Sequence, residues 1–184
     1  MIERMKAILQ KETNEYTFSG DKADFEMLYH DYAPYAFKVA LLVTRNQHLA
    51  ADIIQETFIR VYLNLPKFNH EKPFKPWFYK ILINECNRIM TKNKKVIYIE
   101  DCPENTMSQF GDMEITLENQ EVYNALIQLN NKIRQPLILK YIQGFTAQEI
   151  SEIMDTNINT IKSRLNFGKE KLRKLLARFY EEVM

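Results

Sequence analysis

Apolar residues recur at helical spacing along most of this chain, and the pattern is sharpest in its last third. There Ile150, Ile153 and Met154 share one face of a short helix. Thr146 and Glu149 stand at its start with the spacing of a capping box, in which each side chain accepts a hydrogen bond from a backbone N–H of the first turn. The pattern therefore predicts a short helix that begins just after Thr146.

A second helix is predicted after a turn at residues 155–157. Its buried positions would be Ile158, Ile161 and Leu165, and Asn157 is suited to cap its first turn. The positions between them carry small polar and basic side chains. A short helix, a tight turn and a polar second helix are the order of a helix-turn-helix, whose second helix can enter the major groove of duplex DNA.

The charge of this segment favours DNA binding over a purely structural role. Two short amphipathic helices also occur in all-helical proteins that have no DNA role. Residues 162–178, however, contain seven Lys or Arg and one Glu. A basic cluster on the helix that would enter the groove is the electrostatic signature expected for contact with DNA phosphates.

The rest of the chain is also predicted to be helical. With four Gly, six Pro and few alternating β-branched runs, the composition favours an all-α protein, and 46% hydrophobic residues are enough for packed cores. Pro34 is expected to interrupt or kink the first long helix, and residues 67–75 are expected to form a loop. Further helices are predicted at residues 21–43, 49–65, 76–92, 115–129 and 134–143.

The net charge of +1 conceals a strong segregation of charge along the chain. Residues 1–95 carry 15 basic and 11 acidic side chains, residues 96–131 carry seven acidic and no basic ones, and residues 132–184 carry ten basic and six acidic. This pattern indicates two small positive helical domains joined by a flexible acidic linker. The predicted organisation is an N-terminal extension at 1–20, a first domain at 21–95, a linker at 96–114 and a second domain with the helix-turn-helix at 115–184.

No metal, cofactor or catalytic site is expected. The Cys and His residues lack the spacing of a metal site, and Cys86 lies near the apolar side of a predicted helix, where it is expected to be core. The carboxylates are not accompanied by converging His or Lys, which argues against an enzyme. Because no apolar run reaches the ~20 residues of a membrane span and no signal peptide is evident, we expect a cytoplasmic protein without direct membrane insertion.

One face of the predicted helix at 49–65 combines acidic and amide groups. Asp52, Gln55, Glu56 and Ile59 share it at i, i+3, i+4 and i+7 spacing. An ordinary solvated helix face would have the same pattern, so the alternative to a binding surface stays open.

A second surface of the first domain suits nucleic acid. Lys80, Asn84 and Arg88 lie opposite the apolar side of the helix at 76–92, where the basic groups could hold phosphates and the amide a base edge. Residues 67–95 contain eight Lys or Arg and two Glu, interleaved with aromatic residues. This combination suits single-stranded nucleic acid, because bases stack on rings and the backbone needs positive charge.

Within that basic region the loop at 67–75 is the better candidate to hold an unstacked base. Trp77 and Phe78 are expected mainly to pack in the core.

Three motifs together resemble one family. The segment DIIQETFIRVY from Asp52 resembles the core-polymerase-binding helix of bacterial extracytoplasmic-function (ECF) sigma factors. The segment FKPWFYKILIN from Phe74 is similar to that family's promoter-melting and −10-reading segment, and TIKSRL from Thr160 is similar to the start of its −35 recognition helix. The resemblance runs from about residue 21 to residue 176.

The resemblance implies a two-domain transcription initiation factor. It would bind the clamp helices of the largest subunit and the flap of core RNA polymerase, and promoter DNA both as duplex and as melted single strand. It also implies an anti-sigma factor as partner, which could hold the protein at the membrane. The residues implied are Asp52, Gln55 and Glu56 for core polymerase, Phe68, Phe74, Lys75, Lys80, Asn84 and Arg88 for the −10 element, and Asn159, Thr160, Lys162, Ser163, Arg164 and Lys169 for the −35 element.

The chain departs from the family pattern in the turn of the helix-turn-helix. Asp155 and Asn157 stand where Gly and Pro are common, but Asp tolerates a left-handed backbone and Asn caps helices well, so we expect the fold to survive. The rival interpretation is a stand-alone helix-turn-helix regulator. It would require a dimerisation helix, and no heptad pattern long enough for one is present in the sequence.

Overall fold

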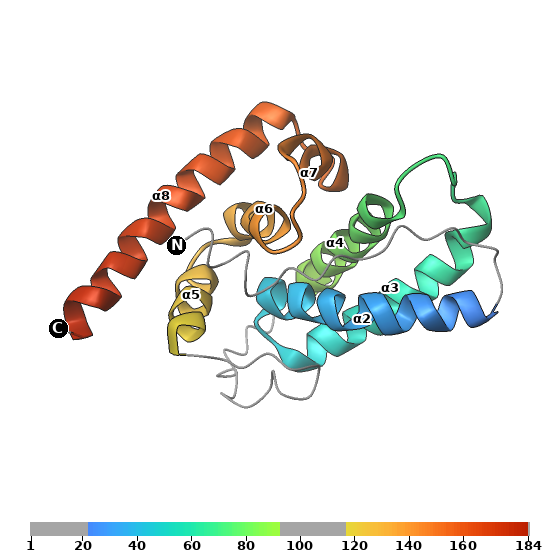
Figure 1. The fold of residues 1–184 in the computed structure, drawn as a ribbon, viewed down its shortest axis with the longest axis horizontal. Helices are drawn as coiled ribbons and strands as arrows, with labels where there is room; N and C mark the ends of the chain where they lie inside the picture. The colour runs from blue at the N-terminus through green and yellow to red at the C-terminus, as the bar shows by residue number, and fades with distance from the viewer. Residues whose placement is uncertain (1–21, 93–116, 184) are drawn as a thin grey trace. The chain divides into compact units, whose positions relative to one another are not determined.

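The computed structural model describes residues 22–92 and 117–183, and every regular element in these ranges is helical, as predicted. The predicted extension at 1–20 and the linker at 96–114 lie outside the described residues. The described helices belong to two separate units (Figure 1). The first contains α2 (Lys22–Thr44), α3 (Gln47–Asn64), the 3₁₀ helix η1 (Leu65–Lys67) and α4 (Phe74–Lys92), and the second contains α5 (Leu117–Ile127), α6 (Asn131–Tyr141), α7 (Ala147–Ile153) and α8 (Ile158–Val183).

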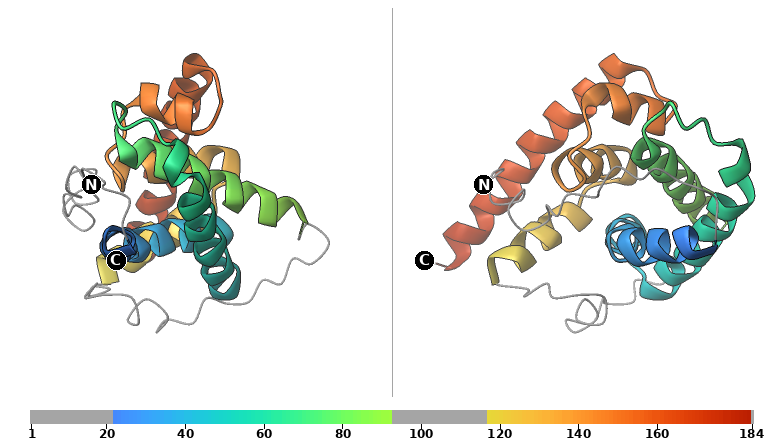
Figure 2. Two further views of the ribbon diagram at one scale, coloured as in Figure 1. Left: turned by 90° about the vertical axis from the view of Figure 1, so that its right-hand side faces the viewer. Right: turned by 45° about the vertical axis from the view of Figure 1, so that its right-hand side comes forward.

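The first unit is a bundle in which α2 packs against α3 and α4 packs against both (Figures 1 and 2). Its core is built from the apolar faces that the helical periodicity predicts, with Leu28, Ile53 and Phe78 fully buried. Cys86 is buried in the same core, as expected, and burial raises the pKa of its thiol to about 12. The thiol is therefore a protonated core group.

Pro34 does not interrupt the first long helix, because α2 continues through it from Lys22 to Thr44. A proline removes one helical hydrogen bond and crowds the preceding turn. The turns on either side of Pro34 are held by tertiary burial of Tyr32, Ala36 and Phe37. Packing in the bundle thus overrides a local helix breaker.

The loop before α4 is shorter than the sequence predicts. α3 begins after Asn46, whose side chain accepts from the backbone N–H of Leu49 at 2.8 Å. Its end is followed directly by η1, which contains Pro66 and shortens the loop. α4 begins at Phe74, two residues before the predicted start at Pro76. Proline is compatible with a first turn because N–H groups there have no helical partner. Phe74 itself is only 8% exposed, so its burial anchors the early start.

The second unit is organised around α8, the longest described helix, which packs against α5, α6 and α7 (Figures 1 and 2). Ile161, Leu165, Leu172 and Leu176 form its buried stripe. Gly168 lies in the same stripe, and a Cβ atom there would come within 2.7 Å of both Ile133 Cγ2 and Leu137 Cδ1 of α6. A larger residue would force these side chains to move, so glycine favours the close approach of α6 and α8.

α6 also begins earlier than predicted, at Asn131 in place of residue 134, so that Pro136 lies inside the helix and not in its first turn. The Asn130 side chain caps it by accepting from the N–H of Ile133 at 3.2 Å. The buried Arg134 donates from Nη1 to the carbonyl oxygens of Ile127 and Leu129, at 3.0 and 2.9 Å. This guanidinium satisfies carbonyls that the end of α5 leaves without helical partners.

We expect Gly168→Ala to destabilise the second unit. Overpacking costs about 1–3 kcal/mol and the gain in helix propensity returns about 1 kcal/mol, so the free energy of unfolding should fall by about 1 kcal/mol. Urea unfolding followed by circular dichroism would measure the loss. The fluorescence of Trp77, the single tryptophan of the chain, should report an unchanged first unit.

Asn166→Ala is the matched control for Gly168→Ala, because Asn166 is exposed on the same helix and should tolerate alanine. A Gly168→Ala protein as stable as the wild type would contradict the close-packing argument.

Candidate nucleic-acid interface

The helix-turn-helix forms as the sequence predicts. At the start of α7, Glu149 N donates to Thr146 Oγ1 at 3.2 Å and Thr146 N donates to Glu149 Oε2 at 2.7 Å, which completes the capping box. Asp155 adopts the left-handed backbone at φ +46°, and Asn157 Oδ1 accepts from the N–H of Asn159 at 2.8 Å. The two substitutions in the turn are therefore compatible with the motif.

α8 carries all six residues predicted to contact a −35 element, but only three of them are fully exposed. Ile161 and Leu165 are buried, and Lys162, Ser163 and Arg164 lie between them in the sequence. Lys162 and Arg164 stand on either side of Ser163, each turned by about 100° from it. Three candidates are exposed, Asn159, Lys162 and Ser163, and three are half-buried, Thr160, Arg164 and Lys169.

The predicted polymerase-binding face of α3 is accessible in the structure. Asp52 and Gln55 are exposed and Glu56 is half-buried. The face continues past these residues into apolar side chains, with Ile59, Tyr62 and Leu63 more than half exposed. Ile59 belongs to the face predicted from the sequence, whereas Tyr62 and Leu63 were not predicted to lie on it.

A charge network links this face to α4. The Glu85 carboxylate is buried and lies 2.6 Å from Arg60 Nε and 2.7 Å from Arg88 Nη2. Arg88 Nε also donates to Glu85 Oε2 at 2.7 Å, whereas the Arg60 contact is not aligned as a hydrogen bond and acts as a charge pair. Glu56 Oε1 completes the network at 3.2 Å from Arg60 Nε and 3.6 Å from Arg88 Nη2.

The network changes how Arg88 has to be interpreted. The sequence suggested a phosphate contact, but the guanidinium is held by Glu85 and Glu56. Its hydrogen bond with Glu85 raises the pKa of Arg88 above its ordinary value, so it remains charged. Half of the Arg88 side chain is still exposed. Glu56 and Arg88, predicted for two different partners, thus lie side by side.

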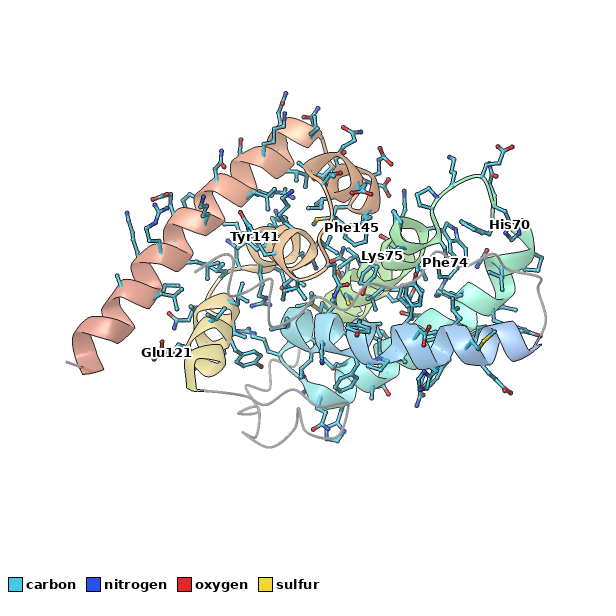
Figure 3. The ribbon with its side chains drawn as sticks, viewed as in Figure 1. His70, Phe74, Lys75, Glu121, Tyr141 and Phe145 are labelled. Carbon is cyan, nitrogen blue, oxygen red and sulfur yellow. The ribbon has the colours of Figure 1, made fainter. Side chains whose placement is uncertain are left out.

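The six residues predicted for the −10 element are not all on one surface. Lys80 and Asn84 share a face of α4, whereas Lys75 is nine residues from Asn84, about two and a half turns, and therefore on the opposite side of the helix. Phe74 is buried against Tyr32 and Phe78, with ring centroids 5.4 and 6.1 Å away. Figure 3 shows Phe74 and Lys75 at the start of α4 and His70 in the preceding loop.

An aromatic cluster lies where that loop meets α4. Phe68 is half-buried, and its ring centroid is 4.8 Å from Trp77 and 5.3 Å from His70. The loop is ordered by Asn69, whose carbonyl oxygen accepts from Lys72 N and whose side chain accepts from Glu71 N, at 3.0 and 2.9 Å.

Trp77 is half-buried in this cluster, whereas Phe78 is fully buried. The sequence predicts both mainly in the core, and only Phe78 meets that expectation. The signal that could have separated them is spacing, because Trp77, Lys80 and Asn84 recur at i, i+3 and i+7 on one face of α4. Trp77 therefore joins the candidate interface.

Across the two described ranges, no group of three or more His, Cys, Asp or Glu is placed to hold a metal ion. No helix there combines the length and apolar character needed to cross a membrane.

Comparison with known proteins finds similarity to sigma factors in both units. Residues 28–96 match the sequence profile of Sigma-70 region 2, and residues 119–172 match that of Sigma-70, region 4. The chain is 29% identical to the ECF RNA polymerase sigma factor SigW of Bacillus subtilis, over 85% of this chain and 91% of that protein. It is 27% identical to the ECF RNA polymerase sigma-E factor of Haemophilus influenzae, over 83% and 87%.

Solved structures show the same fold. The sigma factor RpoE of Bartonella quintana, in complex with the anti-sigma factor NepR, superposes with a TM-score of 0.69 at 24% identity, covering 84% of this chain and 97% of that one. CnrH, in complex with the cytosolic domain of CnrY, superposes with a TM-score of 0.65 at 19% identity, covering 87% and 92%.

We expect Glu85→Gln to destabilise the first unit, because it leaves two guanidinium groups without their shared buried carboxylate. A hydrogen bond to a charged group contributes about 1.5–3 kcal/mol, so the free energy of unfolding should fall by about that amount. Urea unfolding followed by Trp77 fluorescence would measure it. Glu71→Gln, in the exposed loop of the same unit, is the control and should change nothing; equal stability of both variants would show that the network contributes little.

Proposed function

We propose that the two units of this chain contact different parts of the transcription machinery. The chain belongs to the ECF sigma factors and acts as an alternative sigma factor in transcription initiation. The first unit would bind core RNA polymerase and hold the melted −10 region, and the second would bind the −35 duplex. What most supports this division is that residues 28–96, in the first unit, match Sigma-70 region 2, whereas residues 119–172, in the second unit, match Sigma-70, region 4.

We propose that core polymerase binds the α3 face through Asp52, Gln55 and Glu56, with the clamp helices of its largest subunit as the contact. The exposed Ile59 and Tyr62 extend this face with apolar area, which suits a protein partner that has both polar and apolar contacts. Glu56 is already engaged by Arg60 and Arg88, so its carboxylate would be presented in a fixed position.

For the −10 element we propose a division between stacking and phosphate contact. An unpaired base would stack on the cluster of Phe68 and Trp77. On the same face of α4 as Trp77, Lys80 would contact the DNA backbone and Asn84 the edge of a base. The buried ring of Phe74 would support the rings of Phe68 and Trp77 from below. Lys75 would contact DNA only from the other side of the helix, and Arg88 would act partly through the Glu85 network.

The energetics make polymerase necessary for specific binding. Flipping one base out of the duplex costs a few kcal/mol, and stacking on an aromatic side chain returns about 1–3 kcal/mol. With so small a surplus, melting would depend on promoter sequence and on polymerase holding both units on one DNA molecule, which raises their effective concentration. No nucleotide hydrolysis is required in this scheme.

We further propose that an anti-sigma factor binds this chain and keeps it from polymerase. RpoE of Bartonella quintana was solved with such a partner, NepR. The protein would work in the cytoplasm, where core polymerase and DNA are found.

In vitro transcription is the experiment that tests the proposed function. Purified protein and bacterial core polymerase would be incubated with sheared genomic DNA of the source organism, and transcript 5′ ends would be sequenced. We expect discrete, protein-dependent starts that share two upstream motifs. Specific DNA binding by the protein alone, without protein-dependent starts, would instead favour the stand-alone regulator.

In the same assay Asp52→Arg should abolish transcription by preventing core polymerase binding. Truncating one partner of an interfacial charge pair costs about 2–5 kcal/mol, so affinity for core polymerase should fall at least about thirtyfold. Glu26→Arg makes the same charge reversal at an exposed position of α2 and should retain binding. Normal affinity in Asp52→Arg, with the fold intact by circular dichroism, would disprove the assignment of this face.

Arg164→Ala distinguishes a phosphate contact from a base contact on α8. Because Arg164 lies on the flank of the exposed face, we expect the affinity for DNA to fall by a similar factor on all −35 sequences. The slope of log affinity against log salt concentration should decrease in magnitude by about one. Holoenzyme binding to several −35 variants at a series of salt concentrations would measure both. Loss confined to one base position would assign Arg164 to base recognition.

A further inference from the structure

Phe167 is an apolar side chain exposed on the proposed DNA-binding face of α8. It is 57% exposed. Among residues 121–177 of the second unit, no other large hydrophobic residue is exposed. It lies four residues after Ser163, so the two side chains share a face, while the buried stripe of Ile161, Leu165 and Gly168 lies on the other side. It was not among the residues predicted to contact DNA.

The surroundings of Phe167 limit what it can meet. Ser163 precedes it by one turn, and Glu170, paired with Arg173 at 2.6 Å, follows it by nearly one turn. Lys171 and Lys174 are exposed nearby on the same side of the helix. A phenyl ring has no N–H or O–H group to donate to a phosphate oxygen, so a ring within this charged face needs an apolar group on the DNA.

The major groove offers one such group on the edges of its bases, the C5-methyl of thymine, and phenylalanine is among the side chains that pack against it. We propose that Phe167 determines specificity in the −35 element by packing against a thymine methyl. This inference rests on the proposed function of α8 and adds a specific base to it.

Helix geometry gives the proposal a position. Four residues of α-helix advance about 6 Å along the axis, and successive base pairs are about 3.4 Å apart. The thymine selected by Phe167 should therefore lie about two base pairs from the position that Ser163 influences. Ser163→Ala and Phe167→Ala should change base preference at different positions.

The test uses the holoenzyme, assembled from this chain and bacterial core polymerase, on promoter duplexes found by the transcription assay. The −35 block is randomised in two synthetic libraries, one containing thymine and the other deoxyuridine, which lacks only the methyl group. The −10 region is the same in both. Bound DNA is sequenced for the wild type and for Phe167→Ala, Phe167→Leu and Ser163→Ala.

We expect the wild type to prefer thymine over deoxyuridine at one −35 position by about fourfold, the effect of burying one methyl group. Phe167→Ala should lose that preference at that position and keep the others, while Phe167→Leu should retain part of it. Because the side chain is exposed, these variants should fold normally.

Two results would overturn the proposal, and they differ from failure of the proposed function. Equal binding of thymine and deoxyuridine at every −35 position, with base preferences otherwise present, would show that α8 reads DNA without this contact. Uniform loss in Phe167→Ala together with weaker core polymerase binding would place Phe167 against polymerase. Absence of any −35 sequence preference in the wild type would instead disprove the −35 function of α8.

Discussion

A helix that buries one stripe of side chains in a small bundle can offer only the opposite stripe to a partner, and both units of this protein are built under that constraint. In α8 the buried stripe of Ile161, Leu165 and Gly168 leaves the polar and basic positions facing outward. In α4 burial of Phe78 on one side leaves Lys80 and Asn84 on the other. The core of each unit thereby decides which residues are available to polymerase and promoter.

The buried carboxylate of Glu85 connects the two candidate surfaces of the first unit. It is held between Arg60 of α3 and Arg88 of α4, and Glu56 of the proposed polymerase face contacts both arginines. A buried charge is tolerated only when it is paired, so these side chains must keep one arrangement. A partner that engages Glu56 would therefore also act on the arginine nearest the proposed −10 surface.

In the proposed −10 function, the aromatic cluster of Phe68 and Trp77 would supply melting energy without nucleotide hydrolysis. The buried Phe74 supports rings that are only half-buried themselves, and Asn69 orders the loop that carries Phe68. A platform that is already ordered loses little entropy when a base stacks on it. The start of α8 is likewise capped and packed, so its side chains would already be ordered for the proposed contact with DNA.

The sequence by itself determined the all-helical class, the capping box at Thr146, the turn at Asp155 and the separation of charge, because these depend on contacts within one or two helical turns. It also identified the exposed face of α8, since the period of a helix is local. Only the tertiary structure decided that α2 continues through Pro34, that Arg88 is paired with Glu85 and Glu56, and that Trp77 is half-exposed. These outcomes depend on neighbours from other helices, such as Arg60 beside Glu85, and no local pattern of polar and apolar residues encodes which of them meet.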